Sequence, residues 1–192
     1  MTPTSVRDIR NLSLLGQSGS GKTTLLEKLL VTAGAIGAAG SVEKGDTVSD
    51  YDAQEKAIGH SLNSSLAHLE WAEHWINILD TPGLPDFLGR ALATLPAVET
   101  AAVVINASSG VETVTRKIMD TATDKCRMIV VNRIDAPGVD FGALMERITA
   151  TFGKECLPIN LPTAGGAAVI DCFFEPDYDA QPAFSSVREA HD

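Results

Sequence analysis

Near its N-terminus the chain reads Gly16-Gln17-Ser18-Gly19-Ser20-Gly21-Lys22-Thr23-Thr24. An apolar run over residues 11–15 precedes this stretch, and leucines with a helical spacing follow it. A strand, a glycine-rich loop and a helix in this order form a P-loop, in which backbone N–H groups and the helix N-terminus surround a phosphate chain. We therefore expect Gly16 to Thr24 to bind phosphates. Lys22 would reach the β- and γ-phosphates, and the Thr23 hydroxyl would bind Mg²⁺.

Apolar runs and helical patterns alternate along most of the chain. We expect strands over 11–15, 62–71, 75–79, 101–107, 128–131 and 156–160, helices over 22–32, 86–95, 111–123 and 141–152, and a long loop over 35–59. This alternation predicts an α/β P-loop NTPase fold, with a mostly parallel sheet and helices on both faces. Residues 1–162 would form this domain. Residues 163–192 would be the start of an inserted subdomain, with one more short strand over 169–174 and an aperiodic tail, or simply the end of the chain.

A second motif follows the apolar run 76–79 and reads Asp80-Thr81-Pro82-Gly83. The Asp80 carboxylate at the end of a strand would hold Mg²⁺ through its water shell. Gly83 would offer a backbone N–H to the γ-phosphate while leaving the loop free to rearrange when that phosphate leaves.

A third motif, Asn132-Arg133-Ile134-Asp135, follows the apolar run 129–131. The guanine-binding pattern is Asn-Lys-x-Asp, in which the Asp carboxylate accepts hydrogen bonds from two donors of guanine that adenine does not offer in that arrangement. Asn132, Arg133 and Asp135 are therefore predicted to bind guanine, with the Arg133 stem lying across the base. The predicted ligands are GTP or GDP with Mg²⁺. A P-loop ATPase or a small-molecule kinase is the alternative, and the Asn-Arg-x-Asp motif argues against it.

The composition narrows the class of protein further. Apolar residues make up 44% of the 192 residues and charged residues 21%, and no apolar stretch has the length of a membrane span. The net charge is −10 without a basic stripe, which argues against a DNA-binding surface. Three widely spaced cysteines in no metal pattern, and the absence of a signal-peptide core in Met1–Arg10, predict a cytoplasmic location.

From about Arg10 to Phe174 the chain resembles the N-terminal part of the G domain of elongation factor G, and more closely that of its divergent bacterial paralogues. The segments that carry this resemblance are 71–83, 86–87, 107–112 and 157–162. The resemblance implies GTP hydrolysis coupled to work on the ribosome, in translocation or a related step. In this family the fifth guanine motif lies beyond the inserted subdomain, and the sequence stops before it.

Two departures from the family bear on catalysis. The family has a His directly after Asp-Thr-Pro-Gly, which orients the attacking water, whereas this chain has Leu84. Because leucine cannot hydrogen-bond water, we expect impaired hydrolysis, and the alternative function is a guanine-nucleotide switch with little hydrolysis. In the first switch, Ser61 falls where the family has a Mg²⁺-binding Thr, although the neighbouring Ile58 and His60 do not match.

Overall fold

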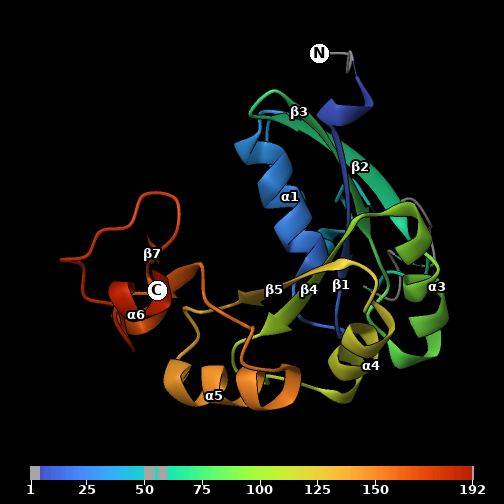
Figure 1. Ribbon diagram of the computed structural model, residues 1–192. Helices are drawn as coiled ribbons and strands as arrows, with labels where there is room; N and C mark the ends of the chain where they lie inside the picture. Colours follow the sequence, from blue (N-terminus) through green and yellow to red (C-terminus); the bar gives the residue numbers. More distant parts are fainter. Residues whose placement is uncertain (1–4, 50–54, 56–59, 192) are drawn as a thin grey trace. The chain divides into compact units, whose positions relative to one another are not determined.

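The structure is a computed structural model that describes residues 5–49, 55 and 60–191. Its strands are β1 (Ile9–Leu15), β2 (Ser65–Trp71), β3 (His74–Asp80), β4 (Thr100–Asn106), β5 (Cys126–Asn132), β6 (Asn160–Pro162) and β7 (Val169–Asp171). Its labelled helices are α1 (Lys22–Thr32), α3 (Leu88–Leu92), α4 (Thr113–Thr121), α5 (Phe141–Phe152) and α6 (Val187–His191), as drawn in Figure 1. Residues 50–54 and 56–59 of the predicted long loop, Ile58 among them, lie outside the described residues.

The larger sheet has the strand order β2-β3-β1-β4-β5. β1 pairs in parallel with both β3 and β4, and β2 is the antiparallel neighbour of β3. The predicted mostly parallel α/β sheet is therefore confirmed. Because β1 has a parallel neighbour on each side, its carboxyl end delivers the P-loop to the edge of the sheet at which such folds bind ligands.

The core of the first compact unit, residues 1–105 with 113–130, forms where α1 packs on the sheet. Leu14 of β1 meets Leu26 and Leu30 of α1, and each of these side chains is at most 2% exposed. The preceding side chain of β1, Ser13, points to the other face, and its hydroxyl lies 2.7 Å from that of Thr94, which follows α3. Helices thus cover both faces, as predicted, with α1 on one side and α3 and α4 on the other (Figure 1).

Two elements of this unit differ from the prediction. β2 begins at Ser65 instead of residue 62, because the N–H groups of Leu62 and Asn63 donate to the Glu55 carboxylate at 2.8 and 2.9 Å. The helix expected over 86–95 is split into a 3₁₀ turn, the short α3 and a second 3₁₀ turn, Leu95–Ala97. Pro96 lies inside that second turn, where proline disfavours a continuing α-helix.

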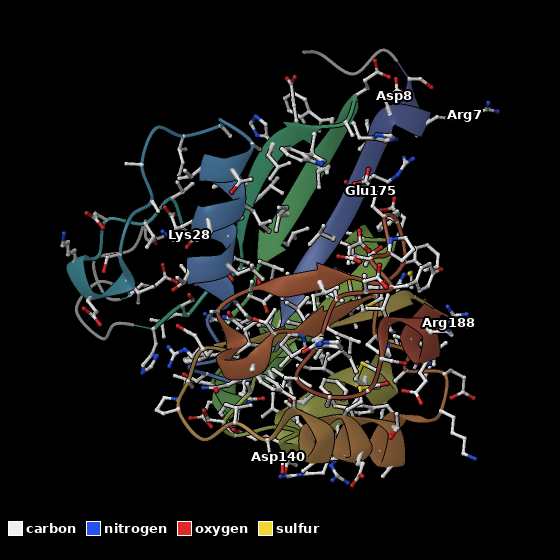
Figure 2. All side chains as sticks on the ribbon, turned by 90° about the vertical axis from the view of Figure 1, so that its left-hand side faces the viewer. Arg7, Asp8, Lys28, Asp140, Glu175 and Arg188 are labelled. Carbon is white, nitrogen blue, oxygen red and sulfur yellow. The ribbon has the colours of Figure 1, made fainter. Side chains whose placement is uncertain are left out.

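The second compact unit comprises residues 106–112 and 131–192. In it, α5 begins after Asp140, whose carboxylate accepts the N–H of Ala143 at 3.0 Å as an N-cap (Figure 2). β6 and β7 form an antiparallel pair, and a small core is built from Leu161, Cys172 and Val187. The tail after residue 176, expected to be aperiodic, therefore supplies α6 and a buried side chain to this core.

The two short strands of this unit are displaced from their predicted positions. The strand expected over 156–160 is β6, Asn160–Pro162. The strand expected over 169–174 ends at Asp171, because the Asp171 carboxylate accepts the N–H groups of Phe173 and Phe174 at 2.8 and 3.0 Å and turns the chain.

Candidate nucleotide-binding site

The P-loop leaves β1 after Leu15 and enters α1 at Lys22. The Lys22 ammonium donates to the carbonyl oxygens of Gly16 and Gln17, both at 2.9 Å, and the side chain is 6% exposed. Lys22 therefore ties the first turn of the helix to the beginning of the loop. Thr24 lies on the exposed side of the same turn.

Burial lowers the pKa of Lys22 to about 8, and the charge of Asp80 opposes this shift. A buried ammonium is costly unless an anion compensates it. The site therefore favours a ligand with negative charge, such as a phosphate chain, which would also return the pKa of Lys22 toward its ordinary value.

Asp80 and Thr23 meet beside this lysine. The Thr23 hydroxyl donates to Asp80 Oδ2 at 2.6 Å, and Asp80 is 1% exposed. Burial raises the pKa of Asp80, while the Thr23 hydroxyl, the Lys22 charge, the Ser49 hydroxyl and the Thr81 N–H oppose this rise. Among the described residues, Asp80 Oδ1 accepts no hydrogen bond of ordinary geometry. A buried carboxylate with an open oxygen next to a hydroxyl is a donor set that fits Mg²⁺.

The remaining predicted magnesium ligand, Ser61, is half-buried in the segment that leads into β2. The backbone next to it is held at Leu62, whose N–H donates to Glu55 and whose carbonyl accepts from Arg90 at 2.7 Å. Besides the Thr23 hydroxyl, the structure places the hydroxyl of Ser49 near Asp80. A magnesium-binding role for Ser61 stays a prediction.

Gly83 lies directly against the P-loop. A Cβ atom at this position would come within 2.6 Å of both Lys22 Nζ and the backbone nitrogen of Ser18, so a side chain has no room there. The segment is fixed at its start by the Thr81 hydroxyl, which donates to the carbonyl of Leu14 at 2.7 Å. The structure thus places Gly83 against the P-loop, and the contact of its N–H with a γ-phosphate stays a prediction.

Two further contacts of the P-loop were not anticipated from the sequence. The Thr115 hydroxyl of α4 donates to Gln17 Oε1 at 2.7 Å, and both side chains are buried. His60 Nδ1 lies 3.4 Å from the Ser18 hydroxyl. Leu84, next to Gly83, is half-buried and offers only packing.

The Asn-Arg-x-Asp motif belongs to the second unit and begins at Asn132, the last residue of β5. The Asn132 side-chain oxygen accepts the N–H of Arg133 at 2.9 Å, and Arg133 has a φ of +57°. Asp135 is exposed. A Cβ atom on Gly166 would collide with the carbonyl of Ile134 and come within 2.9 Å of the Asp135 nitrogen. The glycine-rich loop after β6 therefore packs on the backbone of this motif, a role that no local pattern in the sequence indicated.

Glu27 is another residue that sequence reasoning missed. It is 1% exposed in the middle of α1, and its carboxylate accepts the backbone N–H groups of Gly40 and Val48. The local signal is an acidic residue within a run of leucines one helical turn after Thr23, but it does not indicate which backbone groups the carboxylate binds.

The model of the family described as "Elongation factor Tu GTP binding domain" matches residues 7–184. The chain belongs to this family of GTP-binding domains. It is therefore a domain of the GTPase class, and a guanine nucleotide is its ligand. The resemblance stated from the sequence is confirmed.

Curated relatives are named for elongation, ribosome release and chain release. An elongation factor G-like protein of Mycobacterium tuberculosis is 35% identical over 160 residues, covering 82% of this chain and 22% of that protein. The mitochondrial ribosome-releasing factor 2 of Drosophila melanogaster is 41% identical over 136 residues, covering 69% and 18%. Peptide chain release factor 3 of Gloeobacter violaceus is 36% identical over 167 residues, covering 82% and 31%.

A solved structure is similar to this chain in both fold and sequence. The crystal structure of a protein from Thermus thermophilus superposes on this GTP-binding domain with a TM-score of 0.81 and 34% sequence identity, covering 94% of this chain and 29% of that one. The chain thus spans less than a third of the proteins it matches here. In its described part, no helix is both long and apolar enough to cross a bilayer.

Proposed function

We propose that this domain binds GTP and GDP within an elongation factor G-like protein that works on the ribosome, in translocation or a related step. The relatives support this assignment, since those quoted above are named for ribosome release, elongation or chain release. The ribosome would be contacted through the complete factor in the cytoplasm, with residues 1–162 as the G domain and 163 onward as the start of an inserted subdomain.

The cluster of Lys22, Thr23 and Asp80, with Gly83 against the P-loop, carries this proposal. Lys22 and the loop backbone hold the phosphates. Thr23, Asp80 and Ser61 would hold Mg²⁺. The ion neutralises charge on the phosphates. Gly83 donates its N–H to the γ-phosphate, and the segment around it changes conformation when that phosphate is lost.

Guanine is selected by Asp135, with Asn132 and Arg133 supporting the base. Changing Asp135 to Asn should lower GTP affinity and raise affinity for xanthosine triphosphate, because xanthine offers a carbonyl where guanine has an amine. Asp179→Asn, which alters an exposed carboxylate in the same unit, is the control and should leave both affinities unchanged. If Asp135→Asn keeps its guanine preference, or if ATP competes with GTP on equal terms, the guanine assignment is wrong.

A second function, a nucleotide-dependent switch with little hydrolysis, is favoured by one observation. Leu84 stands where a water-orienting side chain is needed, and its side chain cannot donate or accept a hydrogen bond. GTP turnover by the complete factor, with and without ribosomes, separates the two functions. Strong ribosomal stimulation identifies an active GTPase, and tight GTP binding with little turnover identifies the switch.

A further inference from the structure

Glu27 is a buried carboxylate that the proposed chemistry does not use. It lies on α1 four residues after Thr23, so the two side chains share one face of the helix. Its neighbour Lys28, labelled in Figure 2, is exposed, whereas Glu27 is 1% exposed. A charged group in such a place needs partners that offset the loss of water.

The partners of Glu27 are two backbone N–H groups on either side of one loop. Gly40 donates to Oε2 and Val48 donates to Oε1, each at 2.6 Å. Between them the chain turns back on itself, and the Ser41 N–H donates to Asp46 Oδ1 at 2.6 Å. Figure 2 shows this teal loop beside α1. One carboxylate therefore fastens both ends of the loop to the P-loop helix.

The residues at the end of this loop, 47–49, lead toward Asp80, the predicted magnesium ligand. Thr47 and Ser49 are buried, and their hydroxyl oxygens lie 3.3 Å apart. The Ser49 side chain is hydrogen-bonded to the Asp80 carboxylate, to which the Thr23 hydroxyl also donates at 2.6 Å. A continuous path thus runs from Glu27 through the Val48 backbone and Ser49 to Asp80, and back along Thr23 to α1.

We propose that Glu27 is a positioning residue that holds the loop segment 40–49 on the P-loop helix, so that the Ser49 hydroxyl stays beside the magnesium-binding carboxylate of Asp80. The inference rests on the proposed binding of Mg²⁺ with a guanine nucleotide. Two N–H groups that donate to one buried carboxylate make charge-assisted hydrogen bonds, which are stronger than bonds between neutral groups. Glu27 acts through Ser49 and Asp80 and does not itself touch the nucleotide.

The test compares Glu27→Gln with Glu43→Gln in the 192-residue chain. Glu43 is an exposed residue of the same loop and serves as the matched control. GDP affinity is measured by calorimetry with Mg²⁺ and again with EDTA. The affinity with Mg²⁺ divided by the affinity with EDTA is called the Mg²⁺ gain. Glu27→Gln should reduce the Mg²⁺ gain about tenfold while leaving the affinity in EDTA unchanged, since an amide replaces only one of the two acceptor oxygens. An undiminished gain overturns the proposal.

Limited trypsin digestion without nucleotide gives an independent readout. Lys44 is exposed in the loop that Glu27 holds, so cleavage after Lys44 should become several-fold faster in Glu27→Gln than in the wild type. Equal cleavage rates in Glu27→Gln and the wild type would refute the proposal that Glu27 holds the loop on α1, even if the wild type does not bind GDP. Failure of the wild type to bind GDP would refute the proposed function alone.

A second variant guards against misfolding of Glu27→Gln. Ser49→Ala keeps both bonds of Glu27, so its cleavage after Lys44 should match the wild type, while its Mg²⁺ gain should fall to that of Glu27→Gln. A full Mg²⁺ gain in Ser49→Ala would remove Ser49 from the path and contradict the proposal. Far-UV circular dichroism of each variant shows whether the fold is retained.

Discussion

Gln17 and Thr115 are joined by a hydrogen bond of 2.7 Å although 98 residues separate them in the sequence. The bond ties the side chain of a P-loop residue to α4, and both partners are buried. Thr115→Val should lower the free energy of unfolding by about 1–3 kcal/mol, because it leaves the buried Gln17 oxygen without this donor. Urea unfolding measures the loss. Thr113→Val, at an exposed position of α4, should stay within roughly 0.5 kcal/mol of the wild type. Equal losses in the two variants would deny the bond a stabilising role.

Binding of GDP should depend on pH through Lys22. Burial lowers the pKa of Lys22 to about 8 in the free protein, and a bound phosphate raises it because the ammonium gains an anionic partner. Binding therefore takes up a proton where the free protein has lost one, so GDP affinity should fall as pH rises above about 8. Calorimetry between about pH 7 and 9, in buffers of different ionisation enthalpy, detects that proton.

Lys22→Ala is the control for this pH dependence. The variant should bind GDP about tenfold more weakly or worse, in keeping with the loss of a charge-assisted bond, and the lysine-linked fall in affinity should vanish. If the variant and the wild type show the same pH profile, the titrating group is not Lys22.

Gly166 should be needed for guanine binding, and Gly165 should not. Both glycines have positive φ, +68° and +76°, so alanine brings similar backbone strain at either position. Only at Gly166 would the new Cβ push against the backbone of Ile134 and Asp135, whereas nothing lies within 4 Å of the corresponding point on Gly165. Gly166→Ala should weaken GDP binding by a larger factor than Gly165→Ala. Matching affinities of the two variants, measured by fluorescence titration, would speak against contact with the base-reading motif.

Leu84→His should raise ribosome-stimulated GTP turnover in the complete factor, because imidazole can orient the attacking water and leucine cannot. The measurement is single-turnover hydrolysis at saturating ribosomes and equal salt. Fast turnover by the wild type, with no gain in the variant, would show that another group orients the water. His60 is then the first candidate, since its Nδ1 already lies 3.4 Å from the Ser18 hydroxyl of the P-loop.

The sheet and the phosphate site could be predicted because their signals are local. A glycine-rich loop between an apolar strand and a helix fixes the place of Lys22, and a strand that ends in Asp80 indicates the metal carboxylate. The structure brings these residues together through β1 and β3, which are parallel neighbours in the sheet. Pro96 disfavours an α-helix that continues to residue 95, so this feature of the sequence conflicts with the helical periodicity over 86–95.

The contacts of Glu27 and Gly166 could not be predicted, because each joins two segments that are distant in the sequence and share no recognisable motif. Glu27 looks like a surface residue of an amphipathic helix until the loop after α1 brings the N–H groups of Gly40 and Val48 to it. Gly166 looks like an ordinary turn glycine until it meets the backbone of Ile134. Propensity and periodicity describe single elements, whereas these roles depend on the packing of one element on another.

The central position of β1 bears on how this domain folds as it is synthesised. The P-loop is made early, yet Thr23 and Gln17 form hydrogen bonds with residues 57 and 98 positions later in the sequence. Parallel pairing of this kind requires long loops to close before any contact compensates their entropy, which slows folding. On the ribosome, the nascent P-loop segment must therefore wait for β3, β4 and then α4 to emerge. Phosphate affinity should accordingly appear late in synthesis and in one step, when α4 docks.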